Sequence, residues 1–152
     1  MIDCIRSYAP NFIFTTSLPP AVLAGAIASI KTLKSHGHLR DLQQKHVKYM
    51  KRQLRQQNLP VLSSNSHIIP LFIGCPNRWK TASDMLLNKH AIYVQPINYP
   101  TVPKGEELLR LSPGPLHTPP IIDHFVASAK AVWTELGLVT HKEMHEKEKN
   151  KV

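Results

Sequence analysis

The sequence has 152 residues and a mass of 17.2 kDa, which is long enough for one ordinary domain with a hydrophobic core. With 42% apolar and 19% charged residues it is too apolar for an intrinsically disordered chain, and its two distant cysteines indicate neither a disulfide scaffold nor a zinc site. The net charge is +9, and residues 31–57 hold eight basic residues against one acid.

The start of the chain predicts a helix end and then a strand. Residues Ile2 to Tyr8 suit the end of a helix, and the β-branched and aromatic run from Phe12 to Thr16 is typical of a strand. No second strand follows nearby that could pair with it. We therefore expect residues 1–17 to be the end of a larger domain in which the chain begins.

Two long helices are expected to follow as a connection over residues 18–58. Ser17 is a candidate cap for the first helix, Pro19 and Pro20 suit its first turn, and Gly37 would close it. Its apolar stripe has helical spacing and consists of Val22, Ala26, Ile30 and Leu33.

The second long helix, from about Leu39 to Gln57, is predicted to have two contrasting sides. Its apolar side comprises Leu39, Leu42, Val47, Met50 and Leu54, and its basic side comprises Lys45, Lys48, Arg52 and Arg55. A basic face is compatible with nucleic acid or an acidic membrane, but this one lacks interleaved aromatic residues. We interpret it as a solvated face and expect no nucleic-acid partner.

Residues 59–137 are expected to form a smaller domain of short strands and helices. Strands are predicted at residues 58–62, 67–73, 92–94 and 108–112, and Pro70 indicates an edge position for the second. Helices are predicted at residues 79–88 and 120–137. The order of these elements indicates an α/β class with an α+β small domain.

The last predicted helix has a continuous apolar stripe, and the chain after it has none. The stripe consists of Ile122, Phe125, Val126, Ala129, Val132 and Trp133. From Thr140 onward lysine, glutamate and histidine alternate. Residues 138–152 are therefore expected to be a disordered or frayed tail. No apolar run anywhere is long enough to span a bilayer, so we expect no membrane span.

Arg110 is the most informative single residue, because it lies among leucines in the strand predicted at residues 108–112. A guanidinium there must face an anion or water, since an unpaired buried charge is costly. One interpretation is a structural ion pair or a solvent-facing strand position. The other is a planar grip on a substrate carboxylate through two donors. The sequence leaves both interpretations open.

Hydroxyl groups and one loop suggest further binding functions. Thr15, Thr16 and Ser17 precede a helix start, where backbone amides favour an anion such as phosphate, although ordinary capping also explains Ser17. The loop around Thr101 and Lys104, with prolines and a glycine, suits either a lid or a plain connection.

Metal chemistry is not indicated. His67 and His117 have no partner at ligand spacing, so we interpret them as ordinary polar residues. The pair Cys75-Pro76 resembles the short signature of haem-responsive segments, but two residues carry almost no information.

Several stretches of the sequence resemble the 5-aminolevulinate synthases, within the α-oxoamine synthase family of pyridoxal-phosphate enzymes. They are Arg6 to Pro10, Phe12 to Pro20, Ser66 to Pro70 and, most specifically, Tyr93 to Pro113. The resemblance covers about residues 2–137. It implies the carboxyl-terminal domain of a fold-type I transferase, with long connecting helices and a short, mainly antiparallel sheet. It also implies a role in haem biosynthesis, the condensation of glycine with succinyl-CoA to 5-aminolevulinate.

The resemblance implies roles for four residues. Arg110 matches the arginine that grips the carboxylate of glycine, and Thr101 matches a threonine that contacts the succinyl carboxylate. Thr15 and Thr16 match hydroxyls that reach the phosphate of pyridoxal phosphate across a homodimer interface. The segment from Tyr93 to Arg110 matches a mobile lid. In animals the family works in the mitochondrial matrix, so this location is expected by resemblance.

Two departures from the family pattern matter. Lys104 stands where the family usually has arginine, so a planar contact there is lost. No lysine here matches the lysine that forms the Schiff base, because the chain starts after that position; we expect a carboxyl-terminal portion that is inactive alone. The alternatives are a sister synthase that uses another acyl-CoA, or a noncatalytic basic binding module. A truncated chain would also lack the partner surface for Phe12 to Phe14 and for the first long helix, so we expect poor solubility or self-association.

Overall fold

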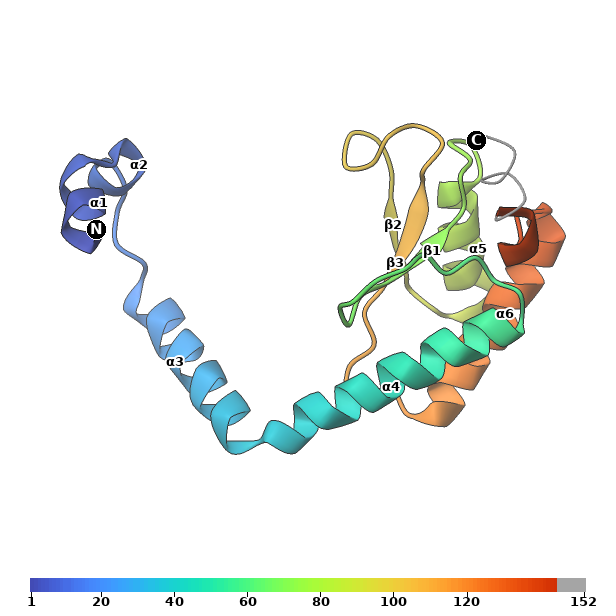
Figure 1. The fold of residues 1–152 in the computed structure, drawn as a ribbon, viewed down its shortest axis with the longest axis horizontal. Helices are drawn as coiled ribbons and strands as arrows, with labels where there is room; N and C mark the ends of the chain where they lie inside the picture. Colours follow the sequence, from blue (N-terminus) through green and yellow to red (C-terminus); the bar gives the residue numbers. More distant parts are fainter. Residues whose placement is uncertain (145–152) are drawn as a thin grey trace. The chain divides into compact units, whose positions relative to one another are not determined.

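The computed structural model describes residues 1–144 and divides the chain into two compact units (Figure 1). The first unit comprises residues 1–37, and the second begins at His38. The division therefore falls between two long helices, inside the segment that the sequence marks as a connection.

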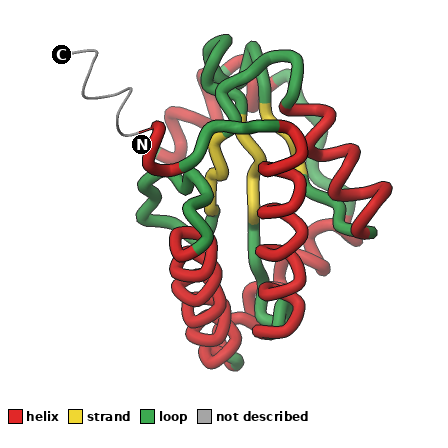
Figure 2. The backbone as a smooth tube through the Cα atoms, turned by 90° about the vertical axis from the view of Figure 1, so that its right-hand side faces the viewer, coloured by secondary structure: helices red, strands yellow, loops and turns green. Residues whose placement is uncertain are grey.

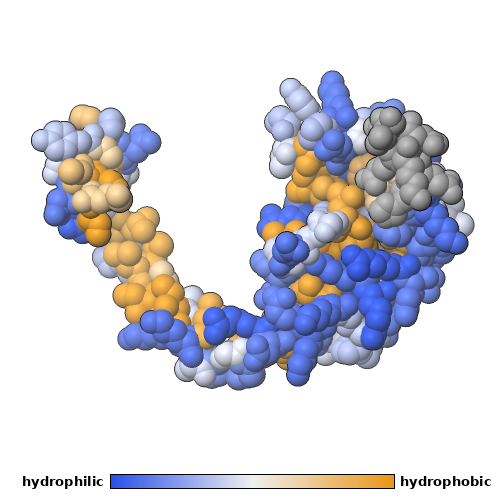
Figure 3. Space-filling view, in the orientation of Figure 1, coloured by the Kyte–Doolittle hydropathy of each residue, from blue (hydrophilic) through white to orange (hydrophobic). Residues whose placement is uncertain are grey.

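The first unit contains three helices and buries none of their residues. They are α1 (Ile2–Tyr8), α2 (Pro10–Ile13) and α3 (Pro20–Ser35). The helix expected at Ile2 to Tyr8 is confirmed. Three residues of the stripe expected on α3 are about half exposed, namely Val22, Ile30 and Leu33. Figure 3 shows this unit as a largely apolar surface. The amphipathic pattern is present, but residues 1–37 contain no core.

The strand predicted at Phe12 to Thr16 is wrong. Pro10 instead begins the one-turn helix α2, in which the Ile13 amide donates to the Ala9 carbonyl at 3.0 Å. A strand needs a neighbour that accepts its backbone amides, and residues 1–37 contain no other strand. Local helical hydrogen bonds therefore satisfy this segment.

The ends of α3 also differ from the prediction. The helix begins at Pro20 after Pro19 as N-cap, with no side-chain hydrogen bond at the cap, so Ser17 does not cap it. Proline at the first position already has the helical backbone angle and no amide to satisfy. At the other end α3 stops at Ser35, and Gly37 begins the next helix rather than closing this one.

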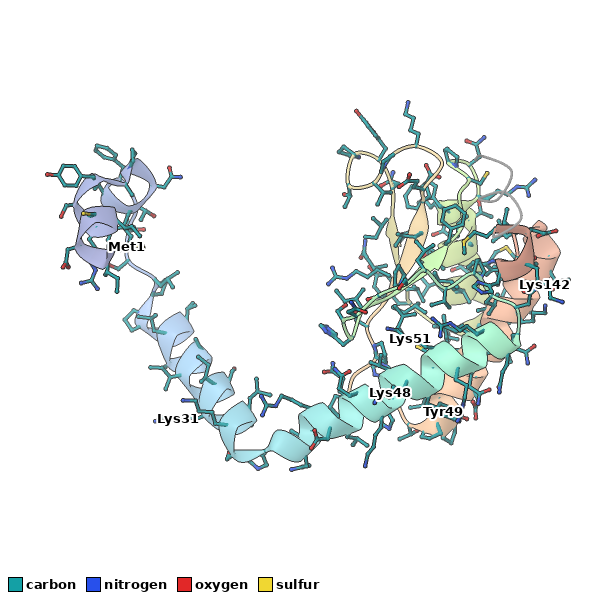
Figure 4. The ribbon with its side chains drawn as sticks, viewed as in Figure 1. Met1, Lys31, Lys48, Tyr49, Lys51 and Lys142 are labelled. Carbon is teal, nitrogen blue, oxygen red and sulfur yellow. The ribbon has the colours of Figure 1, made fainter. Side chains whose placement is uncertain are left out.

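Helix α4 (Gly37–Gln56) is amphipathic, as the sequence predicts. Its buried residues are His46, Val47, Met50 and Leu54, so burial begins at the middle of the helix. Leu42, which was expected on the apolar side, is 37% exposed because it precedes the part that packs on the core. The basic side comprises Lys45, Lys48, Arg52 and Arg55, and all four are exposed. Figure 4 labels Lys48, Tyr49 and Lys51 along this helix.

The second unit is built on a small antiparallel sheet. Its strands are β1 (Ile69–Phe72), β2 (Gln95–Ile97) and β3 (Leu108–Leu111), drawn in yellow in Figure 2. Their order is β1-β3-β2, with neighbouring strands antiparallel. Strand β1 lies at the edge of the three-stranded sheet, as Pro70 indicates. The strand predicted at residues 58–62 is reduced, within residues 1–144, to one bridge from Val61 to Leu71 beside β1. The central strand β3 places Arg110 between Pro70 and Gln95.

The strand predicted at residues 92–94 lies three residues too early, because β2 begins at Gln95. The backbone before β2 bonds to the preceding helix, α5 (Trp79–His90), instead of to a strand. The Ile92 amide donates to the Leu86 carbonyl at 3.0 Å, and the Ser83 hydroxyl donates to the Val94 carbonyl at 2.8 Å. These contacts with a neighbouring helix could not be inferred from the apolar run itself.

Helices α5 (Trp79–His90) and α6 (Pro119–Leu136) confirm the two helices predicted after the first strand. All six residues of the apolar stripe expected on α6 are buried. With Leu54 of α4 and the inward residues Leu71 and Leu109 of the sheet, they form one hydrophobic core. Residues on the other face of β3 alternate with this set, which leaves Arg110 exposed.

Residues 138–144, which the sequence places in the tail, pack against this core in the structure. Leu138 and Met144 are buried, and the amides of His141 and Lys142 donate to the carbonyl and side-chain oxygens of Asn58 at 2.9 and 3.2 Å. The remaining part of the expected tail, residues 145–152, lies outside the described residues.

Candidate functional site

The second unit contains a cavity of about 720 Å³ beside the edge strand β2. Its floor is apolar and includes Met50 of α4, Leu111 of β3 and Phe125 of α6. Its polar lining residues are His90, Tyr93, Gln95, Arg110, Ser112, His117 and His124. A concave apolar site with a few convergent polar groups is the usual form of a small-molecule site.

Arg110 is the permanent cation in the lining of this cavity. The ladder of β3 pins its backbone on both sides, and its buried neighbours Leu109 and Leu111 fix the face on which its side chain lies. Within residues 1–144 no ion pair or hydrogen bond of its guanidinium is found, which weighs against a structural ion pair. An exposed guanidinium with five donors can hold a carboxylate through two parallel hydrogen bonds.

Other polar groups of the cavity come from residues that sequence patterns did not single out. The Tyr93 hydroxyl donates to Oε1 of Gln95 at 2.7 Å. His90 ends α5, and His124 lies in the first half of α6. Only the packing of α5 and α6 beside β2 and β3 brings these side chains to one cavity, so no local pattern could have identified them. His117, interpreted from the sequence as an ordinary polar residue, also lines it.

The loop between β2 and β3 carries Thr101 and Lys104, and both side chains are exposed. The Thr101 amide donates to the Asn98 carbonyl at 2.9 Å, which forms a tight turn. Lys104 Nζ lies 5.5 Å from the ring centroid of Tyr99 in a cation–π contact. Thr101 is not among the residues that line the cavity.

The base of this loop is fixed by a buried carboxylate. Gly105 has φ +90°, a conformation that other residues rarely adopt, and its amide donates to the Glu107 carboxylate at 3.0 and 3.1 Å. Glu107 is 1% exposed, and its carbonyl accepts the amides of Ile73 and Gly74. The tip of the loop is therefore exposed while its second arm is tied to the core.

Thr15 and Thr16 lie in the first unit, between α2 and α3. Both are exposed, and within residues 1–144 their hydroxyls have no hydrogen bond. The structure thus brings Arg110 to a cavity of the second unit, whereas the two threonines belong to the other compact unit.

Residues on and beside the basic side of α4 make contacts within the helix and with the rest of the second unit. The Lys51 ammonium donates to the Ser64 carbonyl at 2.7 Å, and the Arg52 guanidinium lies 5.3 Å from the ring centroid of Tyr49. The Tyr49 hydroxyl donates to Oδ1 of Asp123 at 2.8 Å, and this hydrogen bond raises the pKa of Tyr49 above its ordinary value, with desolvation adding to the effect. These contacts describe a solvated face tied to α6.

Residues 1–144 contain no group of three or more histidine, cysteine or acidic side chains placed to bind a metal ion. Among the helices of the same residues, none is both long and apolar enough to cross a membrane.

Sequence and fold are similar to those of known proteins. The model of the aminotransferase class I and II family matches residues 1–128. The sequence is 53% identical over 138 residues to the mitochondrial 5-aminolevulinate synthase of Neurospora crassa, and 53% identical over 140 residues to the 5-aminolevulinate synthase of Paracoccus denitrificans. Each match covers 91% of this chain but only 22% and 34%, respectively, of the relative.

The fold is similar to that of the serine palmitoyltransferase of S. paucimobilis, solved with a bound adduct of pyridoxal phosphate and myriocin. The TM-score is 0.81 at 26% identity, over 89% of this chain and 34% of that chain.

Proposed function

Because the chain belongs to the aminotransferase class I and II family, we propose that it forms part of a pyridoxal-phosphate-dependent acyltransferase, a 5-aminolevulinate synthase that condenses glycine with succinyl-CoA. Its fold is that of the fold-type I pyridoxal-phosphate enzymes, as the sequence resemblance implies. The chain spans 22% and 34% of the two relatives, so the proposed activity is that of a longer enzyme. From the sequence resemblance, we propose that this chain forms its carboxyl-terminal part.

The exposed guanidinium of Arg110, which lies at the cavity and has no ion pair among residues 1–144, is the observation that carries the proposal. In the proposed enzyme Arg110 binds the carboxylate of glycine. Two parallel hydrogen bonds fix the orientation of the carboxylate as well as its position, which a lysine ammonium cannot do. The ladder on both sides of β3 holds the base of the side chain still, so little backbone freedom is lost on binding.

The loop with Thr101 is proposed to close over the bound substrates. Its exposed tip and its arm tied by Glu107 suit a segment that moves about a fixed base. In the closed state Thr101 donates to the carboxylate of the succinyl group, and the loop excludes water from the cavity. Lys104 keeps the positive charge of the family's arginine and rests on Tyr99.

Thr15 and Thr16 are proposed to hold the cofactor phosphate. Their exposed hydroxyls precede α3 and have no hydrogen bond within residues 1–144, so their chemistry fits a phosphate ligand. Pyridoxal phosphate supplies the electron sink for chemistry at the α-carbon of glycine. These threonines belong to a different compact unit from Arg110, and the proposed enzyme is a homodimer in which they reach the cofactor across the interface.

The location proposed for the enzyme is the mitochondrial matrix. The Neurospora crassa relative is named mitochondrial, whereas the Paracoccus denitrificans relative is not. Location is therefore proposed from the resemblance, separately from the reaction.

The 152-residue chain is proposed to be inactive by itself, because none of its lysines matches the lysine that forms the Schiff base in the family. The test is to incubate the purified chain with pyridoxal phosphate, glycine and succinyl-CoA and to measure 5-aminolevulinate. No product is expected. Turnover by the pure chain would contradict this part of the proposal.

A chimera tests the proposed reaction. This chain replaces the matching 140-residue segment of the Paracoccus denitrificans enzyme, and 5-aminolevulinate formation is measured with succinyl-CoA and with acetyl-CoA. We expect activity and a preference for succinyl-CoA. A preference for acetyl-CoA would favour a sister synthase. A stable, dimeric chimera without activity would contradict the proposal.

Arg110 is tested in the same chimera. Arg110→Lys keeps the charge but removes the planar fork, so the KM for glycine is expected to rise by about 10- to 100-fold, or about 1.4–2.8 kcal/mol. Arg55→Lys, on the exposed face of α4, is the matched control and should leave the KM unchanged. An unchanged KM in Arg110→Lys would remove the proposed role.

A further inference from the structure

The turn between β3 and α6, residues 112–118, forms part of the wall of the cavity that contains Arg110. Pro113 is buried, while His117 is exposed, and both line the cavity. The Gly114 amide donates to His117 Nδ1 at 2.8 Å, and the His117 amide donates to the Gly114 carbonyl at 3.1 Å. The turn is thus closed on itself by one histidine.

The hydrogen bond from the Gly114 amide determines which nitrogen of the neutral His117 ring carries the hydrogen. A backbone amide can only donate, so Nδ1 must accept and the hydrogen of the neutral ring lies on Nε2. A hydrogen on Nδ1 would set two donors against each other and would leave the Gly114 amide without a partner. The bond therefore requires an acceptor at the position of Nδ1.

The same turn is fastened to α4 from the other side. Gln43 Nε2 donates to the Pro113 carbonyl at 3.2 Å, and His46 Nδ1 lies 3.3 Å from the Gly114 carbonyl. A carbonyl only accepts, so His46 carries its hydrogen on Nδ1, the opposite tautomer to His117. His46 is 8% exposed. The Gly114 residue is therefore held by two imidazoles, one from its own turn and one from the buried side of α4.

We infer that His117 is a positioning residue for the carboxylate site: its Nδ1 holds the Gly114 amide and thereby keeps Pro113 in the wall of the cavity beside Arg110. The inference rests on the proposed function for the identity of the carboxylate, which is that of glycine. The backbone of Arg110 is already fixed by the sheet, so His117 acts on the wall that faces the bound group and not on the guanidinium itself.

Three substitutions separate this role from direct contact with the ligand. His117→Asn keeps an acceptor oxygen close to the position of Nδ1, His117→Gln places its amide near the position of Nε2, and His117→Ala keeps neither. Gly114→Ala is the matched control, because an added Cβ would have only an ordinary contact of 3.6 Å with His117 Nδ1 and the amide remains.

The first readout uses the 152-residue chain and needs no activity. Nitrogen NMR should find the hydrogen of the His117 ring on Nε2. Hydrogen exchange of the Gly114 amide should become at least about tenfold faster in His117→Ala and His117→Gln, and stay within about threefold in His117→Asn. Unchanged exchange in His117→Ala would overturn the inference.

The second readout uses the active chimera. The KM for glycine should rise by about five- to tenfold in His117→Ala and in His117→Gln, with kcat within about twofold, while His117→Asn and Gly114→Ala should stay near the parent. Recovery by His117→Gln but not by His117→Asn would overturn the inference in favour of direct contact through Nε2. An inactive parent chimera would count against the proposed function, and the exchange measurement would still decide whether His117 holds the turn.

Discussion

The two compact units of the chain differ in whether their apolar residues are buried. In the first unit, α1, α2 and α3 carry apolar side chains at helical spacing, but none is buried. In the second unit, α4 and α6 carry similar stripes, and the whole stripe of α6 and the part of the α4 stripe from Val47 onward are buried in one core with the sheet. The comparison shows that an amphipathic pattern produces a helix locally, whereas a core requires a second surface that supplies the opposite half.

The largest effect on stability is expected from a substitution in the core of the second unit. Leu109 is fully buried, so Leu109→Ala is expected to lower the free energy of unfolding by about 3 kcal/mol. Ile27 of α3 is 53% exposed, and Ile27→Ala should change it by less than about 0.5 kcal/mol. Both tryptophans lie in the second unit, so fluorescence during urea unfolding measures its stability. Equal effects of the two substitutions would contradict the difference between the units.

The exposed surface of the first unit is expected to cause self-association of the 152-residue chain. Removing apolar area with the double variant Leu23→Lys and Ile27→Lys should weaken association at least about tenfold, or about 1.4 kcal/mol. The double variant Ser29→Lys and Thr32→Lys, which adds the same two charges to α3 without removing a large apolar side chain, is the control. Sedimentation velocity measures the effect, and a clean monomer of the unchanged chain would count against the prediction.

A hydrogen bond between Tyr49 of α4 and Asp123 of α6 is expected to make the stability of the second unit depend on pH. The hydrogen bond to Asp123 raises the pKa of Tyr49, so this contact stabilises the fold at lower pH and is lost as the pH rises through the raised pKa. Asp123→Asn should therefore shift the pKa of Tyr49 down toward its ordinary value. Carbon NMR of the tyrosine rings measures it, with Tyr49→Phe identifying the signal. An unchanged pKa would mean that the contact is not kept in solution.

The smallest effect is expected at the surface of the second unit. Lys80 and Asp84 form an ion pair one helical turn apart on α5, with side chains 65% and 48% exposed. Lys80→Ala should cost about 0.3 kcal/mol at low salt and less at high salt, because exposed pairs are screened. Urea unfolding at two salt concentrations measures this. A loss above about 1 kcal/mol would show that this surface contributes more than its exposure indicates.

Elements with a long hydrophobic period could be predicted from the sequence, whereas short strands were predicted less well: those expected at residues 67–73 and 108–112 are confirmed as β1 and β3, and the others are not strands at the expected residues. The whole stripe of α6 and most of that of α4 are buried as expected, because side chains three and four residues apart always share a helix face. The run Phe12 to Thr16 has the composition of a strand but no neighbour, and β2 lies three residues beyond the expected one. A strand is completed only by its partner, which local composition does not contain.

Some residues of the candidate site could likewise be identified from the sequence, and others only from the structure. Arg110 was identified from its leucine neighbours and lies on the outer face of β3, at the cavity. The roles of Arg110, Thr101, Thr15 and Thr16 stay predictions that the chimera and its variants address. His90, Tyr93, Gln95 and His124 carried no local signal, since they reach the cavity from α5, from β2 with the segment before it, and from α6.

By itself, the sequence determined where the long helices of the second unit run, which of their faces is apolar, and that an arginine at position 110 must meet an anion or water. Only the tertiary structure decided that this arginine borders a cavity and that Gly114 lies between His46 and His117, residues 68 and 3 positions away in the chain. The difference lies in how far apart in the chain the interacting residues are. Helical periodicity acts between residues a few positions apart, whereas a cavity and its wall exist only after distant segments have packed together.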